Sequence, residues 1–185
     1  MVTCSRTRWA DGGAMDYLTL SALLDRPGVV ELAQVTTPAG GPAVSPVLLV
    51  ALINGEDISD APQAEQAVVQ AAKARLESVL AEAQGLTDGY LRQRGYPLPL
   101  ATVPPILSGW VRDIARYRLH AHRLSDEKND PIVRDYRDAL LLLGQVATGK
   151  FSLGLGDSLP PAGGNPSVSG PGRTFSMDSL QDYGK

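Results

Sequence analysis

The segment Gly144–Phe151 (GQVATGKF) has almost the spacing of a phosphate-binding loop. That loop reads G-x-x-x-x-G-K followed by Ser or Thr, because the hydroxyl binds the Mg²⁺ that accompanies the nucleotide. Here Phe151 takes the place of the hydroxyl residue, and the segment ends a predicted helix instead of starting one. We therefore predict an ordinary helix C-terminus around Gly149, and no nucleotide or other cofactor.

The two histidines, His120 and His122, are also poor candidates for chemistry. Residues two apart on a helix point about 200° away from each other, so they do not bind one metal ion together. The paired carboxylates, such as Glu56-Asp57 and Asp126-Glu127, have no nucleophile and base arranged around them. These patterns predict no catalytic residue and no metal site, and we expect the protein not to be an enzyme.

Arg112, Arg116 and Arg123 recur at helical spacing, and we call this set the basic stripe. It could contact DNA phosphates, or an acidic neighbouring subunit. Alternatively, it is a solvated face with salt bridges to acids nearby in the sequence, among them Asp113. The chain has a net charge of −3 and a pI near 5.3, which argues against a general DNA-binding protein.

Composition sets further bounds on the 185-residue chain. Hydrophobic residues make up 43% but aromatic residues only 5%, which favours helices with thin, Ala- and Leu-lined contacts. The single cysteine, Cys4, is compatible with a reducing cytoplasm. No apolar run approaches the ~18 residues of a membrane span, and no signal peptide is recognisable, so we expect no membrane partner.

Hydrophobic periodicity predicts an all-α fold, a helical bundle with one long helix. Short helices are expected before Pro27 and over residues 29–35, followed by an irregular insertion at about 36–60. Within it, 47–53 is either a strand or a helical turn, since so short a run has no decisive period, and we favour the helical turn. A long helix is predicted from Pro62 to about Arg94. Its apolar stripe consists of Val69, Ala72, Leu76, Val79, Ala83, Leu86 and Tyr90.

Two more helices are predicted after the long one. Pro104-Pro105 starts a helix that runs to about Leu124, and Asp130-Pro131 starts another that runs to about Thr148. Between the long helix and the next lies a Pro-rich elbow. The residues expected to shape it are Tyr90, Arg94, Tyr96, Pro97, Pro99, Pro104 and Tyr117.

We divide the chain into an N-terminal arm (1–14), a helical domain (15–153) and an extended Gly/Pro-rich C-terminal arm (154–185). Of the 32 residues from Gly154 to Lys185, 11 are Gly or Pro, so the arm cannot build a core of its own. It still contains Phe175, Met177, Leu180 and Tyr183, which we predict to be anchors for a partner.

Around the elbow the sequence resembles a known family. The segments that carry the resemblance are Asp88–Leu91, Arg94, Tyr96–Leu100, Val103-Pro104 and Asp113–His120, with Tyr17 and Glu31-Leu32 near the N-terminus. They are similar to the small neck protein of Mu-like phages and prophages, over most of residues 15–155. The chain differs from that pattern by Gly95, between Arg94 and Tyr96, and by a longer segment at 38–60.

The resemblance implies a virion structural protein made in the cytoplasm of a host bacterium and located at the neck of the particle. Such a head–tail connector, or adaptor, forms a ring of usually twelve copies. The implied partners are other copies, the portal protein and a tail-side neck or terminator protein. DNA would pass through the ring without specific binding. The alternative is a DNA-binding regulatory or packaging protein that uses the basic stripe.

Overall fold

The computed structural model describes residues 16–122 and 130–155, and within these ranges it contains helices and no strand. The all-α fold with one long helix is therefore confirmed. The helices are α1 (Leu20–Leu23), α2 (Val29–Thr36), α3 (Pro46–Asn54), α4 (Gln63–Arg94), α5 (Pro105–His120) and α6 (Pro131–Ala147). Both predicted arms lie almost entirely outside the described residues.

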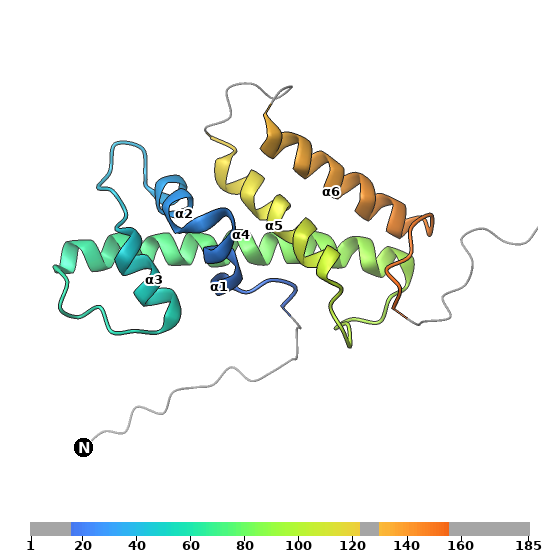
Figure 1. Ribbon diagram of the computed structural model, residues 1–185, viewed down its shortest axis with the longest axis horizontal. Helices are drawn as coiled ribbons and strands as arrows, with labels where there is room; N and C mark the ends of the chain where they lie inside the picture. The colour runs from blue at the N-terminus through green and yellow to red at the C-terminus, as the bar shows by residue number, and fades with distance from the viewer. Residues whose placement is uncertain (1–15, 123–129, 156–185) are drawn as a thin grey trace, which may run out of the picture.

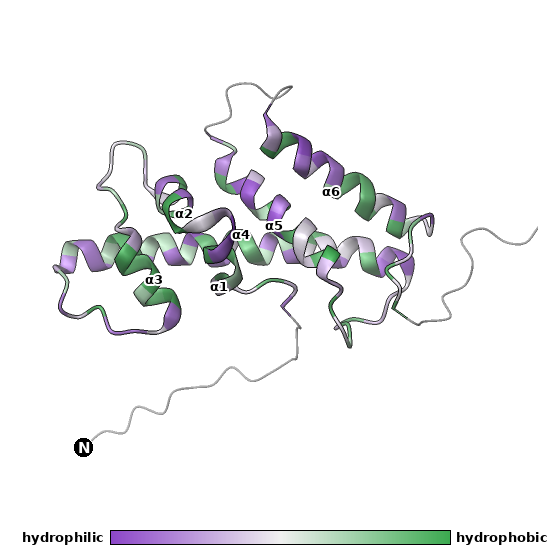
Figure 2. Cartoon of the chain, viewed as in Figure 1, coloured by the Kyte–Doolittle hydropathy of each residue, from purple (hydrophilic) through white to green (hydrophobic). Residues whose placement is uncertain are grey.

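The long helix α4 is the axis of the molecule (Figure 1). Helices α2 and α3 pack against its N-terminal half, α1 lies near its middle, and α5 and α6 pack against its C-terminal half and against each other. Contacts between α2 and α5 join the two groups. Apolar residues alternate with polar ones along α4, as the hydropathy colouring shows (Figure 2), so one helix contributes a core stripe to both groups.

The buried stripe of α4 differs from the predicted one in its second half. The buried positions are Val69, Ala72, Leu76, Leu80, Ala83, Thr87 and Leu91. They recur at an average spacing near 3.67 residues, whereas the predicted stripe used 3.5. A long helix that does not supercoil keeps about 3.6 residues per turn, so a 3.5-residue pattern drifts off the core face after a few turns. Val79, Leu86 and Tyr90 are only half-buried.

The N-terminal helices form where the sequence predicts them. Thr19 caps α1, its Oγ1 accepting a hydrogen bond from the Ala22 amide (3.2 Å). The helical path breaks at Arg26, whose extended backbone (φ −152°, ψ 117°) is what the following Pro27 favours. Helix α2 then begins at Val29 and ends at Thr36.

The insertion at 36–60 is not irregular throughout, because it contains the nine-residue helix α3. Pro46 occupies the first turn, and Gly55 ends the helix in the left-handed conformation (φ 82°). The assignment of 47–53 to helix is confirmed, and its extent was too short. Only Leu49 of this apolar helix is fully buried.

The elbow begins with a defined helix stop at Gly95. This residue adopts φ 95°, its amide donates to the Arg92 carbonyl (3.0 Å), and the Tyr96 amide donates to the Leu91 carbonyl (3.1 Å). This pair of bonds satisfies carbonyls that the helix end would leave free, and it requires a residue that tolerates positive φ. The extra glycine of this chain is thus the residue that ends α4.

Helices α5 and α6 begin where the sequence predicts them. The buried face of α5 consists of Leu107, Trp110, Val111, Ile114, Ala115 and Leu119. Asp130 caps α6, its Oδ1 accepting from the Ile132 amide (2.8 Å), and Pro131 follows at the first position. Helix α5 ends at His120, four residues earlier than predicted.

Candidate interaction surfaces

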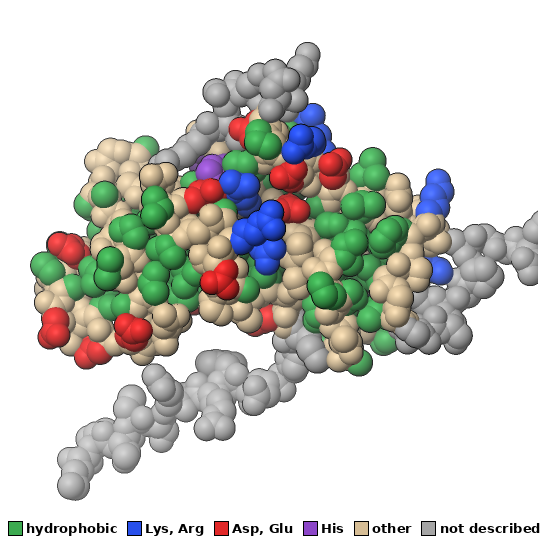
Figure 3. Space-filling view, viewed as in Figure 1, with side chains coloured by type: hydrophobic (Ala, Val, Ile, Leu, Met, Phe, Trp, Pro, Cys, Tyr) green, Lys and Arg blue, Asp and Glu red, His purple; other side chains and the backbone are tan. Residues whose placement is uncertain are grey.

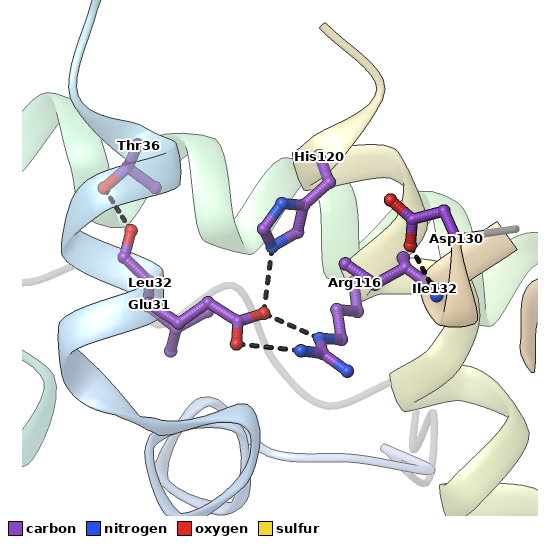
Figure 4. Close-up of polar contacts among 7 residues, drawn as sticks. All are labelled: Glu31, Leu32, Thr36, Arg116, His120, Asp130 and Ile132. Carbon is purple, nitrogen blue, oxygen red and sulfur yellow. Dashed lines mark hydrogen bonds and ion pairs between the residues drawn. The ribbon is translucent and has the colours of Figure 1, made fainter. Parts of the chain in front are cut away.

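One member of the basic stripe, Arg116, forms an ion pair within the protein. Arg116 of α5 makes a two-pronged ion pair with Glu31 of α2, with 2.6 Å from Nε to Oε1 and 2.9 Å from Nη2 to Oε2. His120, one turn further on, lies with its Nε2 2.9 Å from the same Oε1 (Figure 4). All three side chains are half-buried, so this cluster ties α2 to α5 and removes Arg116 from the free positive surface.

The electrostatics of this cluster follow from its geometry. Burial alone would raise the pKa of Glu31, but hydrogen bonds and charge from Arg116 and His120 outweigh it and hold the pKa below its usual value. The hydrogen bonds to Glu31 in turn raise the pKa of Arg116. Glu31 therefore stays ionised at neutral pH, and the pair stays intact.

Arg112 sits one turn before Arg116 and next to a second acidic group. Its Nε is buried and has no hydrogen-bond partner among the described residues. Burial, reinforced by the charge of Asp135, raises the pKa of the neighbouring Asp113, while Arg112, Arg26 and Arg116 lower it by less. Arg123, the third member of the stripe, lies outside the described residues.

For Arg116, the alternative of a salt bridge to an acid nearby in the sequence is wrong. The acid that binds Arg116 is 85 residues away, on α2. Arg116 and His120 are four residues apart and so lie on one helix face. That spacing is the only local signal for a shared acidic partner, and it does not say which acid that is.

A second polar contact, also missed by sequence reasoning, holds the N-terminal segment. The Tyr17 hydroxyl donates to Asp88 of α4, Ser108 Oγ donates to the Tyr17 carbonyl (2.7 Å), and Gln84 Nε2 donates to the Leu18 carbonyl (3.0 Å). Burial and the bond to Asp88 raise the pKa of Tyr17. Residues 17–18 are thus fixed against α4 and α5.

The predicted elbow residues divide into two groups. Tyr96 is buried, Tyr90, Arg94 and Pro104 are half-buried, and Pro97 and Pro99 are exposed, all in or beside the segment that joins α4 to α5. Tyr117 lies elsewhere. Its ring stacks on Tyr136 with centroids 4.0 Å apart and planes 7° from parallel, so it joins α5 to α6.

The segment resembling a phosphate-binding loop is a helix end, as predicted. The Gly149 amide donates to the Val146 carbonyl (2.9 Å) and the Lys150 amide to the Gln145 carbonyl (2.9 Å), with Gly149 at φ 74°. Those amides are thereby unavailable to a phosphate. Phe151 packs edge-on against Trp110, with ring centroids 5.9 Å apart.

Other predicted features can be placed only in part. The described residues hold no group of three or more His, Cys, Asp or Glu side chains that could bind a metal ion. Across the same residues, no helix combines the length and apolarity needed to cross a membrane. The proposed anchors Phe175, Met177, Leu180 and Tyr183 lie outside the described residues.

Charge is distributed unevenly along the axis of α4 (Figure 3). Residues 37–72 contain four acidic residues and no basic one, and we call the exposed Glu56, Asp57, Asp60 and Glu65 the acidic end. At the other extreme, residues 89–111 and 139–155 contain Arg92, Arg94 and Lys150 and no acidic residue. We call these three the basic end.

Comparison of the sequence with known proteins shows the family of this chain. Residues 17–169 match the family described as Bacteriophage Mu, Gp36, which is most of the chain. The chain belongs to this family. The resemblance to a Mu-like phage family is therefore confirmed, and it rests on residues that the structure places in the α4–α5 elbow, in the Glu31 cluster and at the Tyr17 contact.

One curated relative is "Mu-like prophage FluMu protein gp36" of Haemophilus influenzae, 40% identical over 85 residues. The alignment covers 46% of this chain and 57% of that protein, so the chain spans a little over half the length of the relative. No solved structure matches this chain. The family relationship thus comes from sequence alone.

Proposed function

We propose that this protein is a virion structural protein, a head–tail connector that forms a ring between the portal and the tail-side neck proteins. Membership of the bacteriophage Mu Gp36 family carries the proposal, since it makes the chain a phage protein. The ring, with twelve copies expected, and the neck position are parts of the proposal. So is the passage of DNA through the ring without specific binding.

The polar side chains support a structural role. Two of the long-range polar contacts join distant parts of the chain: Glu31 with Arg116 and His120 joins α2 to α5, and Tyr17 with Asp88 joins the N-terminal segment to α4. The nearest match to a nucleotide-binding motif has its amides bonded to its own helix. These residues stabilise a rigid block, which is what a subunit of a symmetric assembly requires, and we propose that the protein is not an enzyme.

The competing function, DNA binding through the basic stripe, draws less support from the geometry. Arg116 is neutralised by Glu31, and the Nε of Arg112 is buried. A DNA-binding face would need these cations free to replace counterions on phosphates. This alternative predicts salt-sensitive affinity for duplex DNA that falls when Arg112 and Arg123 are changed to Ala.

The test is to look for the protein in purified virions. Mass spectrometry gives its copy number, and electron microscopy with a labelled chain gives its position. About a dozen copies confined to the neck would support the connector role. Absence from the particle, or many copies spread over the head, would overturn it. Binding of the purified protein to duplex DNA at physiological salt would favour the alternative.

For the arm, we propose that Phe175, Met177, Leu180 and Tyr183 dock onto a neighbouring copy or the portal. A chain truncated after Gly154 should fold yet fail to join the neck. Circular dichroism checks folding, and particle composition checks assembly. A truncated chain that still enters virions at the normal copy number would contradict this role.

A further inference from the structure

The two charged ends of the molecule lie too far apart to neutralise one another within one copy. Glu65 in the first turn of α4 and Arg94 at its last position are 29 residues apart, so at 1.5 Å per residue the separation is roughly 44 Å. The Debye length at physiological salt is only about 8 Å. Each end therefore presents a net charge of one sign to its surroundings.

The charges at the ends are mostly free of internal partners. Among the described residues, Glu56, Asp60, Glu65, Arg94 and Lys150 form no ion pair, whereas Arg92 lies 3.6 Å from Asp88. Hydrogen bonds from Ser59 hold the pKa of the exposed Asp57 below its usual value, so this carboxyl group stays ionised.

The dipole of α4 explains only part of this arrangement. Acids near a helix N-terminus and bases near its C-terminus stabilise the helix, which accounts for Glu65, Arg92 and Arg94. Glu56 and Asp57 precede the first turn of α4 by several residues, and Lys150 follows α6. They extend each charge beyond what the helix itself needs.

Each end also offers an apolar side chain for a contact. Val47 of α3, in the acidic half, is 77% exposed, and Ile106, in the first turn of α5 after the elbow, is 42% exposed. Specific interfaces combine an apolar centre with a polar rim. An exposed aliphatic residue in the same half as exposed charges fits that composition.

We propose that the acidic end of one copy binds the basic end of the next copy. Both surfaces are on every molecule and are complementary to each other, and neither is complementary to itself. The contact is therefore heterologous, head to tail, and it leaves one acidic and one basic end free after each addition. Such a contact produces a closed ring or an open chain. This inference rests on the proposed function, for which it names the surfaces that join neighbouring subunits.

The test uses charge reversal with rescue in the full-length protein. One variant carries Glu56→Lys, Asp60→Lys and Glu65→Lys, which makes both ends basic. A second carries Arg94→Glu and Lys150→Glu, which makes both ends acidic. Arg137→Glu, an exposed change midway along α6, is the matched control, and circular dichroism checks that all three fold.

Self-association is measured by sedimentation velocity at ~10 mM and at ~1 M salt, where the Debye length is about 30 Å and 3 Å. We expect the unaltered chain and the control to associate at low salt and to separate at high salt. Each reversed variant alone should associate at least ~10-fold more weakly, because like charges then face each other. An equimolar mixture of the two variants should recover association.

Three results would overturn the proposal: an unaltered chain that stays monomeric at low salt, variants that associate as well as the control, or a mixture that recovers nothing. A closed dimer as the end product would also overturn the head-to-tail order. Particle composition separates this inference from the connector role. Virions that take up either reversed variant at the normal copy number would refute the contact and leave the connector role standing.

Discussion

Replacing Glu31 by Gln is the sharpest test of the cluster that joins α2 to α5. The substitution keeps the shape of the side chain but removes the charge that Arg116 and His120 face at 2.6–2.9 Å. A hydrogen bond to a charged group contributes about 1.5–3 kcal/mol and a neutral one about 0.5–1.5 kcal/mol. Gln has one acceptor oxygen in place of two, so the bond from Arg116 Nη2 is lost and the other two bonds become neutral ones. A loss of ~2 kcal/mol and two weakenings of ~1 kcal/mol each set an upper bound of about 4 kcal/mol.

Solvent reduces that bound. The Glu31 and Arg116 side chains are 24% and 32% exposed, which lies between a fully buried pair and a surface pair worth ~0–1 kcal/mol. We therefore expect Glu31→Gln to lower the free energy of unfolding by about 2 kcal/mol. For a domain of this size that corresponds to a fall in Tm of about 5–10 °C. Urea unfolding followed by circular dichroism measures it.

The chain offers a matched control in Glu82, which pairs with Arg118 across α4 and α5 but is 53% exposed. Glu82→Gln should cost less than ~1 kcal/mol. In a double-mutant cycle, Arg116→Gln should add little to Glu31→Gln, because the two share one interaction.

The dependence on pH follows from the lowered pKa of Glu31. A carboxyl group with a depressed pKa in the folded state contributes stability above its unfolded pKa and loses it as the pH falls through the folded value. The gap between the unaltered chain and Glu31→Gln should therefore close below pH 4.5, the ordinary value. Equal costs for Glu31→Gln and Glu82→Gln, or a gap that persists unchanged in acid, would refute the reasoning.

Three further predictions concern single positions. Gly89→Ala should stabilise the protein by ~0.5–1 kcal/mol, because nothing lies within 4 Å of the added Cβ on α4. Gly95→Ala should destabilise it by ~1 kcal/mol or more, because Gly95 has φ 95°. Thermal melts in which Gly95→Ala is the more stable variant would contradict the role of Gly95 in ending α4. Tyr17→Phe should remove a contribution that the unaltered chain keeps in full below pH 10, the ordinary Tyr pKa, and loses as the pH rises from there towards the raised pKa of the folded state. The stabilities of the two proteins should therefore converge only above pH 10, and a difference that stays constant in alkali would refute this. Phe151→Ser completes the phosphate-loop sequence, but it should lower the free energy of unfolding by ~2–3 kcal/mol through lost packing on Trp110. Calorimetry should detect no binding of ATP to this variant. Measurable ATP binding would show that the amides of Gly149 and Lys150 are available to a phosphate.

Much of the fold could be predicted because its signals are local. The Asp130-Pro131 start of α6, the Pro104-Pro105 start of α5 and the end of α6 near Gly149 each depend on residues within one or two helical turns. The second half of the α4 stripe could not be placed, because a small error in period accumulates along 32 residues.

The polar contacts could not be predicted, for a different reason. The partner of Arg116 is chosen by how α2 packs against α5, and the partner of Tyr17 by where the N-terminal segment crosses α4. Contacts over 85 and 71 residues of chain leave no periodicity in the sequence. Tyr117 was misplaced for the same reason, since its stacking on Tyr136 depends on the packing of α5 against α6.

The continuity of α4 has a mechanical consequence. With no break between Gln63 and Arg94, the helix is a rod about 48 Å long that is held by different helices at its two halves. A tilt of about 5° at one extremity displaces the other by about 4 Å, roughly the width of one side chain. A molecule that binds at one end of α4 therefore determines the position of its other end. The helix acts as a lever between two distant binding sites.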